Sequence, residues 1–143
     1  MNLAAIRRGI ANVLDQIDGC RVFAAIPDTL TASGVTALVI APDDSYVTYS
    51  EAAGLVSRND VRMRVLIIPA QQAGSVRVMD EIDALLSCGT GEPRSIRTLL
   101  GDNISADGTA CSVSAQIATV RTMSINDITC VVGELSLKIL ARC

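Results

Sequence analysis

Residues 110–141 read ACSVSAQIATVRTMSINDITCVVGELSLKILA, and this stretch decides the fold. Near its end, Leu135, Leu137 and Ile139 alternate with polar residues. That alternation is typical of a half-exposed strand in an antiparallel sheet. Asn126-Asp127 separates it from another long β-type segment, so we expect strands over 110–124 and 128–141. The chain therefore closes on a long hairpin.

Upstream patterns predict the remaining elements. Apolar residues at three- and four-residue steps predict a helix over 2–18, which Asn2 caps and Gly19 ends. We expect strands over 21–26, 35–41 and 61–69, the second of them stopped by Pro42-Asp43-Asp44. A helix should start at Ser75 and end at Gly89, and a shorter one should run from about Pro93 to Leu100.

These elements follow the order α-β-β-β-α-α-β-β. Such an order predicts an α+β fold: one domain over 1–143, with a mostly antiparallel mixed sheet and helices packed on one face. The polar residues at about 43–60 suggest a long loop or hairpin excursion, which we expect to be disordered in free subunits. The run Val35–Ile40 carries no charge, which suits a sheet edge completed by a neighbouring subunit.

Composition argues against several classes of function. The chain has no histidine, so the commonest general base and metal ligand is missing. Its five cysteines are odd in number and lack CxxC spacing, which favours reduced thiols over a disulfide framework or zinc site. The net charge of −3 and the absence of a basic face disfavour direct nucleic-acid binding. We therefore expect no enzyme, no cofactor, no bound metal and no membrane segment.

Three motifs could suggest chemistry but have simpler interpretations. Cys88-Gly89-Thr90-Gly91 fits a helix end and a turn better than a catalytic thiol, because no histidine can generate the thiolate. The carboxylates Asp80, Glu81 and Asp83 fit a solvated helical face. Asp43-Asp44 beside Pro42 is a turn signature.

The charged residues on the predicted strands are the remaining candidates. They could solvate the outer face of the sheet, line the lumen of a ring, or contact neighbouring subunits. With two tyrosines and one arginine of the 43–60 segment, the candidate interface residues are Tyr46, Tyr49, Arg58, Arg62, Arg64, Arg121, Glu134 and Lys138.

Three stretches resemble a known family across the whole chain. They are the opening helix and strand (Leu3-Ala4-Ala5-Ile6-Arg7 through Arg21-Val22-Phe23 to Ile26-Pro27-Asp28), the strand 61–69 with the helix containing Met79-Asp80-Glu81-Ile82-Asp83-Ala84-Leu85-Leu86, and the closing hairpin (Val120-Arg121-Thr122 to Gly133-Glu134-Leu135-Ser136-Leu137-Lys138-Ile139). Together they resemble the tail terminator, or tail completion, proteins of long-tailed bacteriophages with non-contractile tails, especially phages of actinobacteria. Where those proteins often carry aromatics near the last turn, this chain has Ile125, Ile128 and Val131.

The resemblance implies a virion structural protein without a cofactor or reaction. It implies a ring of six subunits, assembled in the host cytoplasm, at the head-proximal end of the tail. Such a ring ends polymerisation of the tail tube protein and joins a neck or head-completion protein, while DNA passes through its lumen without sequence-specific contacts. The nearest alternative is another head–tail connector component, such as a stopper or head-completion protein. A small cytosolic enzyme or a regulatory binding domain fits less well.

Overall fold

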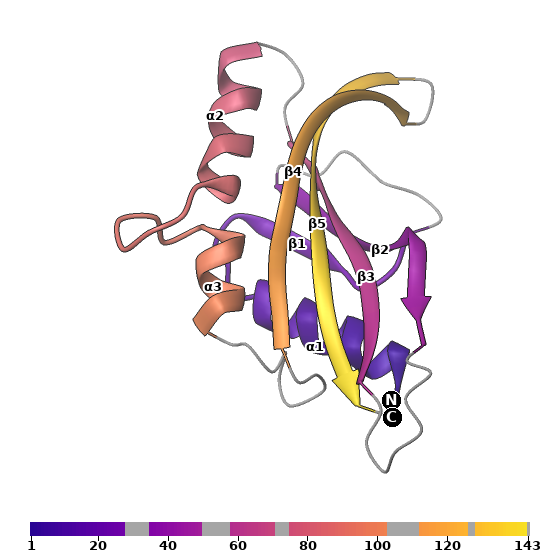
Figure 1. The fold of residues 1–143 in the computed structure, drawn as a ribbon. Coiled ribbons are helices and arrows are strands. Elements are labelled where there is room, and N and C mark those ends of the chain that lie inside the picture. The colour runs from indigo at the N-terminus through magenta and orange to yellow at the C-terminus, as the bar shows by residue number, and fades with distance from the viewer. Residues whose placement is uncertain (28–34, 50–57, 71–74, 103–111, 126–127, 143) are drawn as a thin grey trace.

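The computed structural model describes residues 1–27, 35–49, 58–70, 75–102, 112–125 and 128–142. The helices are α1 (Leu3–Leu14), α2 (Ser75–Leu86) and α3 (Ile96–Asp102). The strands are β1 (Cys20–Phe23), β2 (Thr36–Thr48), β3 (Arg58–Ile68), β4 (Ser112–Ile125) and β5 (Ile128–Arg142). The chain thus has the predicted α+β fold, in the predicted order (Figure 1).

The five strands form one sheet in the order β1-β2-β3-β5-β4. β1 runs parallel to β2, and every other neighbouring pair is antiparallel. β3 therefore lies at the centre, where Val65 stands opposite Leu135 of β5. The two ends of the sheet are the short strand β1 and the long strand β4.

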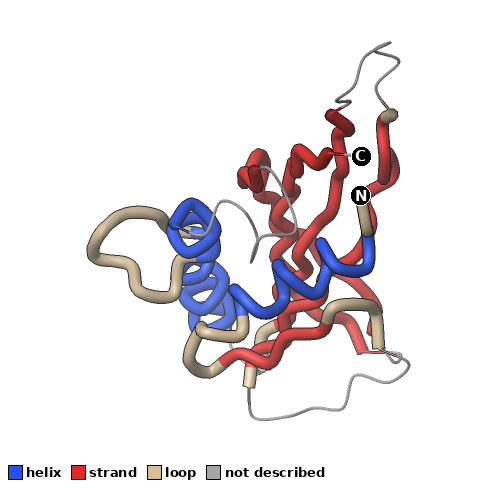
Figure 2. Tube along the Cα trace, turned by 90° about the horizontal axis from the view of Figure 1, so that it is seen from below, coloured by secondary structure: helices blue, strands red, loops and turns tan. Residues whose placement is uncertain are grey.

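All three helices pack on the same face of the sheet, as expected. One buried cluster joins Ile6 and Ile10 of α1, Ile82 of α2 and Ile96 of α3 to alternate residues of the strands. Figure 1 shows α1 behind the strands, with α2 and α3 to the left, and Figure 2 gives the arrangement from below. Both views place the N- and C-terminal ends side by side, and Figure 1 shows them near the start of β4 and the end of β5.

β4 and β5 form the closing hairpin but differ in burial. In β5 the side chains of Leu135, Leu137 and Ile139 are at most 6% exposed and point into the core. In β4 all seven residues from Gln116 to Thr122 are exposed. A bulge between Ala115 and Ala118 interrupts the pairing of β4 with β5 just where this exposed segment begins. β5 is an interior strand of the core, whereas this part of β4 contributes little to it.

The expectations about β2 were wrong in two respects. The strand does not stop at Pro42-Asp43-Asp44 but continues to Thr48, because its pairing with β3 resumes at Val47 after an irregular stretch. Proline is tolerated at such an interruption of the ladder. β2 also lies between β1 and β3, so the uncharged run Val35–Ile40 is not at a sheet edge. Residues 43–48 and 58–60 belong to β2 and β3, where Val47 pairs with Val61 and Thr48 with Asp60, and 50–57 lie outside the described residues. The expected disorder of this segment in free subunits stays a prediction.

Three helix boundaries also differ from the predictions: the end of α1 and both ends of α3. α1 ends at Leu14, and turns lead from it to Gly19, whose φ of 76° is left-handed. α3 begins at Ile96 rather than near Pro93, because the Ser95 hydroxyl accepts the Thr98 N–H at 3.1 Å and so caps the helix. Gly101 lies inside α3 and does not end it.

Candidate functional site

The helix-free face of the sheet holds a network of charged side chains centred on Glu134 of β5. One carboxylate oxygen lies 3.2 Å from Nη1 of Arg64 on β3, and the other lies 2.7 Å from Nη2 of Arg121 on β4. Beside this triad, Nζ of Lys138 lies 3.4 Å from a carboxylate oxygen of Asp60. Arg62, opposite Lys138 in the β3–β5 register, is exposed. The network therefore spans three adjacent strands.

Glu134 needs two arginines because its surroundings are partly apolar. Its side chain is 13% exposed, and Leu66, its register partner on β3, is 9% exposed. Val132, two residues away on the same strand, is fully buried. A carboxylate shielded from water in this way is costly unless it is paired. The triad thus cross-links β3, β5 and β4 on the side of the sheet opposite the helices.

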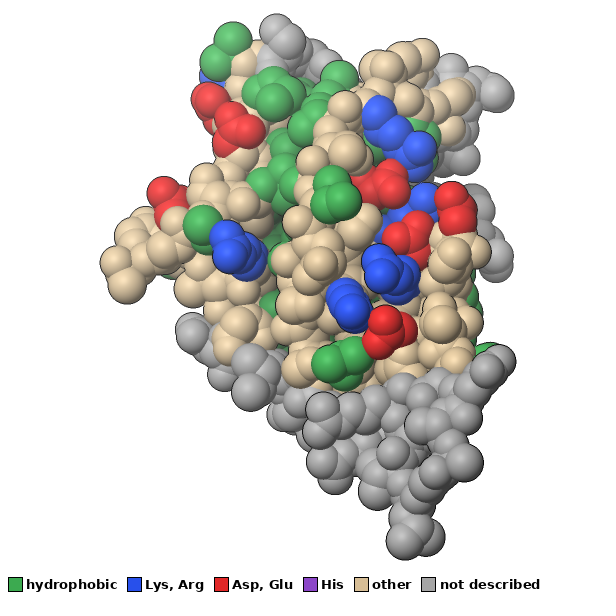
Figure 3. Space-filling view, viewed as in Figure 1, with side chains coloured by type: hydrophobic (Ala, Val, Ile, Leu, Met, Phe, Trp, Pro, Cys, Tyr) green, Lys and Arg blue, Asp and Glu red, His purple; other side chains and the backbone are tan. Residues whose placement is uncertain are grey.

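The visible charges on this face alternate in sign. Figure 3, in the view of Figure 1, shows Lys and Arg side chains intermixed with Asp and Glu side chains over the strands. The six charges named above are four cations and two carboxylates, so the two signs are interspersed and their sum is +2. Among the described residues, the contacts of this network are ion pairs between arginine or lysine and carboxylates.

The structure brings together five of the eight predicted interface residues: Arg62, Arg64, Arg121, Glu134 and Lys138. The two tyrosines lie elsewhere. Tyr46 packs against the core, and its buried hydroxyl has no hydrogen-bond partner within the described chain, whereas Tyr49 is 67% exposed. Arg58 begins β3 opposite Arg142, and its side chain lies outside the described atoms.

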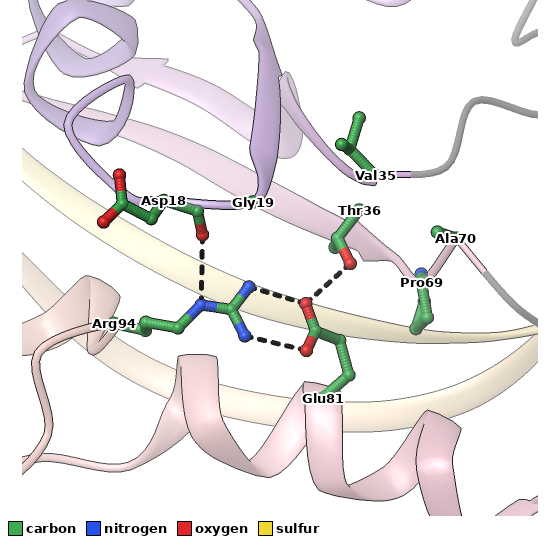
Figure 4. Close-up of a pocket in the computed structure, with 8 residues that line it drawn as sticks. All are labelled: Asp18, Gly19, Val35, Thr36, Pro69, Ala70, Glu81 and Arg94. Carbon is green, nitrogen blue, oxygen red and sulfur yellow. Dashed lines mark hydrogen bonds and ion pairs between the residues drawn. The ribbon is translucent and has the colours of Figure 1, made fainter.

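A second cluster, which the sequence did not reveal, surrounds Arg94 between α2 and α3. The guanidinium holds Glu81 of α2 through two parallel hydrogen bonds of 2.8 and 2.6 Å. Its Nε also donates to the carbonyl oxygen of Asp18, and the hydroxyl of Thr36 donates to Glu81 at 2.7 Å. Arg94 therefore ties α2 to the turn before β1, and Glu81 ties α2 to Thr36 at the start of β2 (Figure 4).

These residues line a pocket of about 470 Å³. The Arg94 hydrogen bonds, with a smaller contribution from Thr36, hold the pKa of Glu81 below its usual value. Burial raises the pKa of the nearby Cys20 thiol despite its 3.5 Å contact with Arg94. A neutral thiol and a carboxylate already bound by an arginine are not prepared for catalysis. The residues drawn in Figure 4 are Asp18, Gly19, Val35, Thr36, Pro69, Ala70, Glu81 and Arg94.

The acidic cluster on α2 was therefore interpreted only partly correctly. Asp80 and Asp83 are exposed to solvent, as expected, but Glu81 is partly buried and faces Arg94. The pair is separated by 13 positions and by the end of a helix, and no local spacing rule predicts such a contact. The described residues contain no group of three or more cysteines and carboxylates placed to hold a metal ion.

The Cys88–Gly91 stretch is the turn that the sequence predicts. Gly89 has φ 124°, a left-handed conformation that glycine adopts easily, and its N–H donates to the Thr98 hydroxyl at 3.2 Å. Cys88 is exposed and lies 3.5 Å from an Arg97 nitrogen. The Ser95 hydroxyl donates to the carbonyl oxygen of Ser87 and so closes the turn between α2 and α3.

Within the described residues, no helix has both the length and the apolar character needed to cross a membrane. No protein-family model and no curated protein matches the chain.

Proposed function

We propose that this chain is a virion structural protein: a tail terminator that forms a ring, of six subunits by the resemblance of its sequence, at the head-proximal end of a long, non-contractile phage tail. In this role it ends polymerisation of the tail tube protein and then joins a neck or head-completion protein. The protein acts through its surfaces and carries out no reaction.

The observation that carries the proposal is the helix-free face of the sheet, where most of the named charges are held in ion pairs within the chain. A subunit that surrounds a DNA passage needs one face that stays in contact with water and does not hold DNA tightly. In the triad, Glu134 pairs with both Arg64 and Arg121, which lowers the availability of the two arginines to DNA phosphates. The helices lie on the opposite side and are free to face the outside of a ring.

The arrangement of ionisable groups in the described residues is consistent with a structural role. Glu81 is bound by Arg94, and the Cys20 thiol has a raised pKa. The polar side chains at the pocket between α2 and β2 therefore serve to hold helix and sheet together. This is the chemistry expected of a protein that must keep its shape in an assembly rather than turn over a substrate.

The test is to add purified protein to polymerising tail tubes and to examine them by electron microscopy. A terminator caps one end of each tube and arrests its length. The matched control is a charge-reversal variant of an exposed residue away from the sheet face, Arg77→Glu, which should cap tubes normally. Binding to DNA-filled heads without capping of tubes would instead identify a stopper or head-completion protein.

A further inference from the structure

We infer that the exposed segment Gln116–Thr122 of β4 is the site at which a second copy of this chain docks, and that it pairs there with the β1 edge of that copy. The inference rests on the proposed function, because a closed ring of identical subunits requires two different surfaces that fit each other. It names those surfaces as the two ends of the sheet.

The segment Gln116–Thr122 is unusually exposed for part of a strand. Seven consecutive exposed residues in a strand mean that neither face is covered by the rest of the described chain. Ile117 is 65% exposed and Val120 is 44% exposed, although both are large and apolar. β4 is also the last strand of the sheet, so the N–H and C=O groups along its outer edge have no strand beside them in the described part of the protein.

β4 also lacks the usual protection against edge-to-edge pairing. Monomeric proteins guard long edge strands with lysine, proline or inward-pointing charge. The 14 residues of β4 contain neither lysine nor proline, and Arg121 is their only charged residue. Because its guanidinium is held by Glu134 of the same chain, the edge offers chiefly backbone hydrogen bonds and apolar contact.

The strand order identifies the partner edge. Within the described residues, β1 is the only other strand with a neighbour on one side alone. β1 runs parallel to β2, and β3 runs antiparallel to β2. β4 runs in the same direction as β3, because both are antiparallel to β5. Within one subunit, β4 and β1 therefore point in opposite directions. If a second copy continues the sheet in the same orientation, its β1 therefore lies antiparallel to β4. The chain supplies the complementary edge itself.

The side chains of the two edges also match by face. In β1, Cys20 and Val22 pack toward the core. Arg21 and Phe23 lie on the other side, where the guanidinium carbon of Arg21 is 5.1 Å from the centre of the Phe23 ring. In β4, Val120 pairs with Gly133, whose position faces α2, whereas Arg121 lies on the side of Glu134. An antiparallel junction can thus place Cys20 and Val22 on the same side as Val120, toward the helices, and Arg21 and Phe23 on the side of Arg121.

This junction has a consequence for the ring. Continuing the sheet from copy to copy would keep the charged face of every subunit on the same side. The network around Glu134 would then form one uninterrupted surface, and the helices would form the opposite layer. Pairing of β4 with β1 of the next copy would therefore account for both the proposed subunit contact and the proposed lumen surface.

The test combines an edge variant with a matched control. Val120→Lys places a charge on the docking edge, and Val76→Lys makes the same change at a 72% exposed position on α2. Circular dichroism and thermal unfolding first establish that both variants fold as the native chain does. We expect Val120→Lys to lose ring formation and tube capping, whereas Val76→Lys should retain both.

Cross-linking then tests the partner edge directly. In rings bound to tubes, mild oxidation of a Val120→Cys variant should link position 120 to Cys20 of another copy, as identified by mass spectrometry of linked peptides. Links between two copies of position 120, or no link at all, would overturn the assignment to β1. If Val120→Lys still caps tubes, the docking inference fails and the terminator function stands. If the native chain caps no tubes, the proposed function itself fails.

Discussion

The two strands of the closing hairpin show how one local pattern can serve two purposes. β4 has 14 residues and β5 has 15, and they pair along almost their whole length. Yet β5 carries core residues at every second position, whereas Gln116–Thr122 of β4 is exposed throughout. Position in the sheet explains the difference, because β5 lies between two strands, whereas β4 has a neighbouring strand on one side only among the described residues.

The helices add to this difference. α2 contacts β5, where Gly133 leaves room for Ile82. Within one hairpin, the side chains of β5 contribute to the stability of the core, whereas the exposed segment of β4 is accessible to the second subunit proposed above. The following predictions test that difference.

The largest effect is expected in the interior of β5. Leu137 is 1% exposed, so Leu137→Ala should lower the free energy of unfolding by about 2–5 kcal/mol through lost burial and a cavity. Urea unfolding measures the change. The matched variant on β4, Val120→Ala, should cost no more than about 1 kcal/mol, because that side chain is 44% exposed. Equal losses in the two variants would break the comparison.

A smaller effect is expected where α2 meets β5. A Cβ added at Gly133 would lie 3.1 Å from Cγ2 of Ile82 and 3.3 Å from Ile67. Gly133→Ala should therefore destabilise the fold by about 1–3 kcal/mol through overpacking. Combining it with Ile82→Ala removes the contacted methyl group, so the double variant should lose less than the sum of the two single losses. Strict additivity would show that α2 does not approach β5 so closely.

Lowering the pH should destabilise the packing of α2 on β5 and leave the exposed segment of β4 unaffected. The pKa of Glu81 is lowered in the folded chain, so its contribution to stability is present above the usual value of 4.5 and is lost as the pH falls through the lower, folded value. The protection of amides in α2 and around Gly133, corrected for the intrinsic pH dependence of exchange, should then fall, with little change in Gln116–Thr122. Glu81→Gln should reduce this acid response, whereas Asp83→Asn, an exposed carboxylate on the same helix, should preserve it. The opposite ranking of the two variants would refute the role of Glu81.

The smallest effect on folding is expected at the bulge of β4. Ile117 is 65% exposed, so Ile117→Ala should change the unfolding free energy by less than about 0.5 kcal/mol. Thermal unfolding of the free chain checks this. The same variant should still weaken assembly, which sedimentation of rings would detect. A large loss of stability would mean that the side chain is covered within the subunit.

The sequence predicted those parts of the fold whose signal is local. The helical stripe of Ile6, Ile10 and Val13 and the alternation of Leu135, Leu137 and Ile139 are buried as their spacing indicates. The extension of β2 past Pro42 could not be foreseen, because the pairing that continues the strand is supplied by β3. Local chemistry at Pro42-Asp43-Asp44 favoured a turn, and tertiary pairing prevailed.

The candidate site was predictable to a similar extent. Alternation along β3 and β5 placed Arg62, Arg64, Glu134 and Lys138 on strands, and the strand order then brought them together. The contact between Arg94 and Glu81 depends on how α2 and α3 pack against each other, and the spacing of residues in the sequence does not predict that packing. Which strands form the edges follows from the strand order as well, so Val35–Ile40 was a reasonable but wrong choice for an edge.

The adjacent chain ends have a practical consequence for imaging. Both lie near the start of β4 and the end of β5, so a fluorophore attached at either end would leave the proposed docking segment uncovered. Each subunit in a capped tail could then carry one dye, and stepwise photobleaching of single tails would count the copies. The closeness of the two ends also makes them suited to a donor and acceptor pair that reports whether the subunit keeps its shape on assembly.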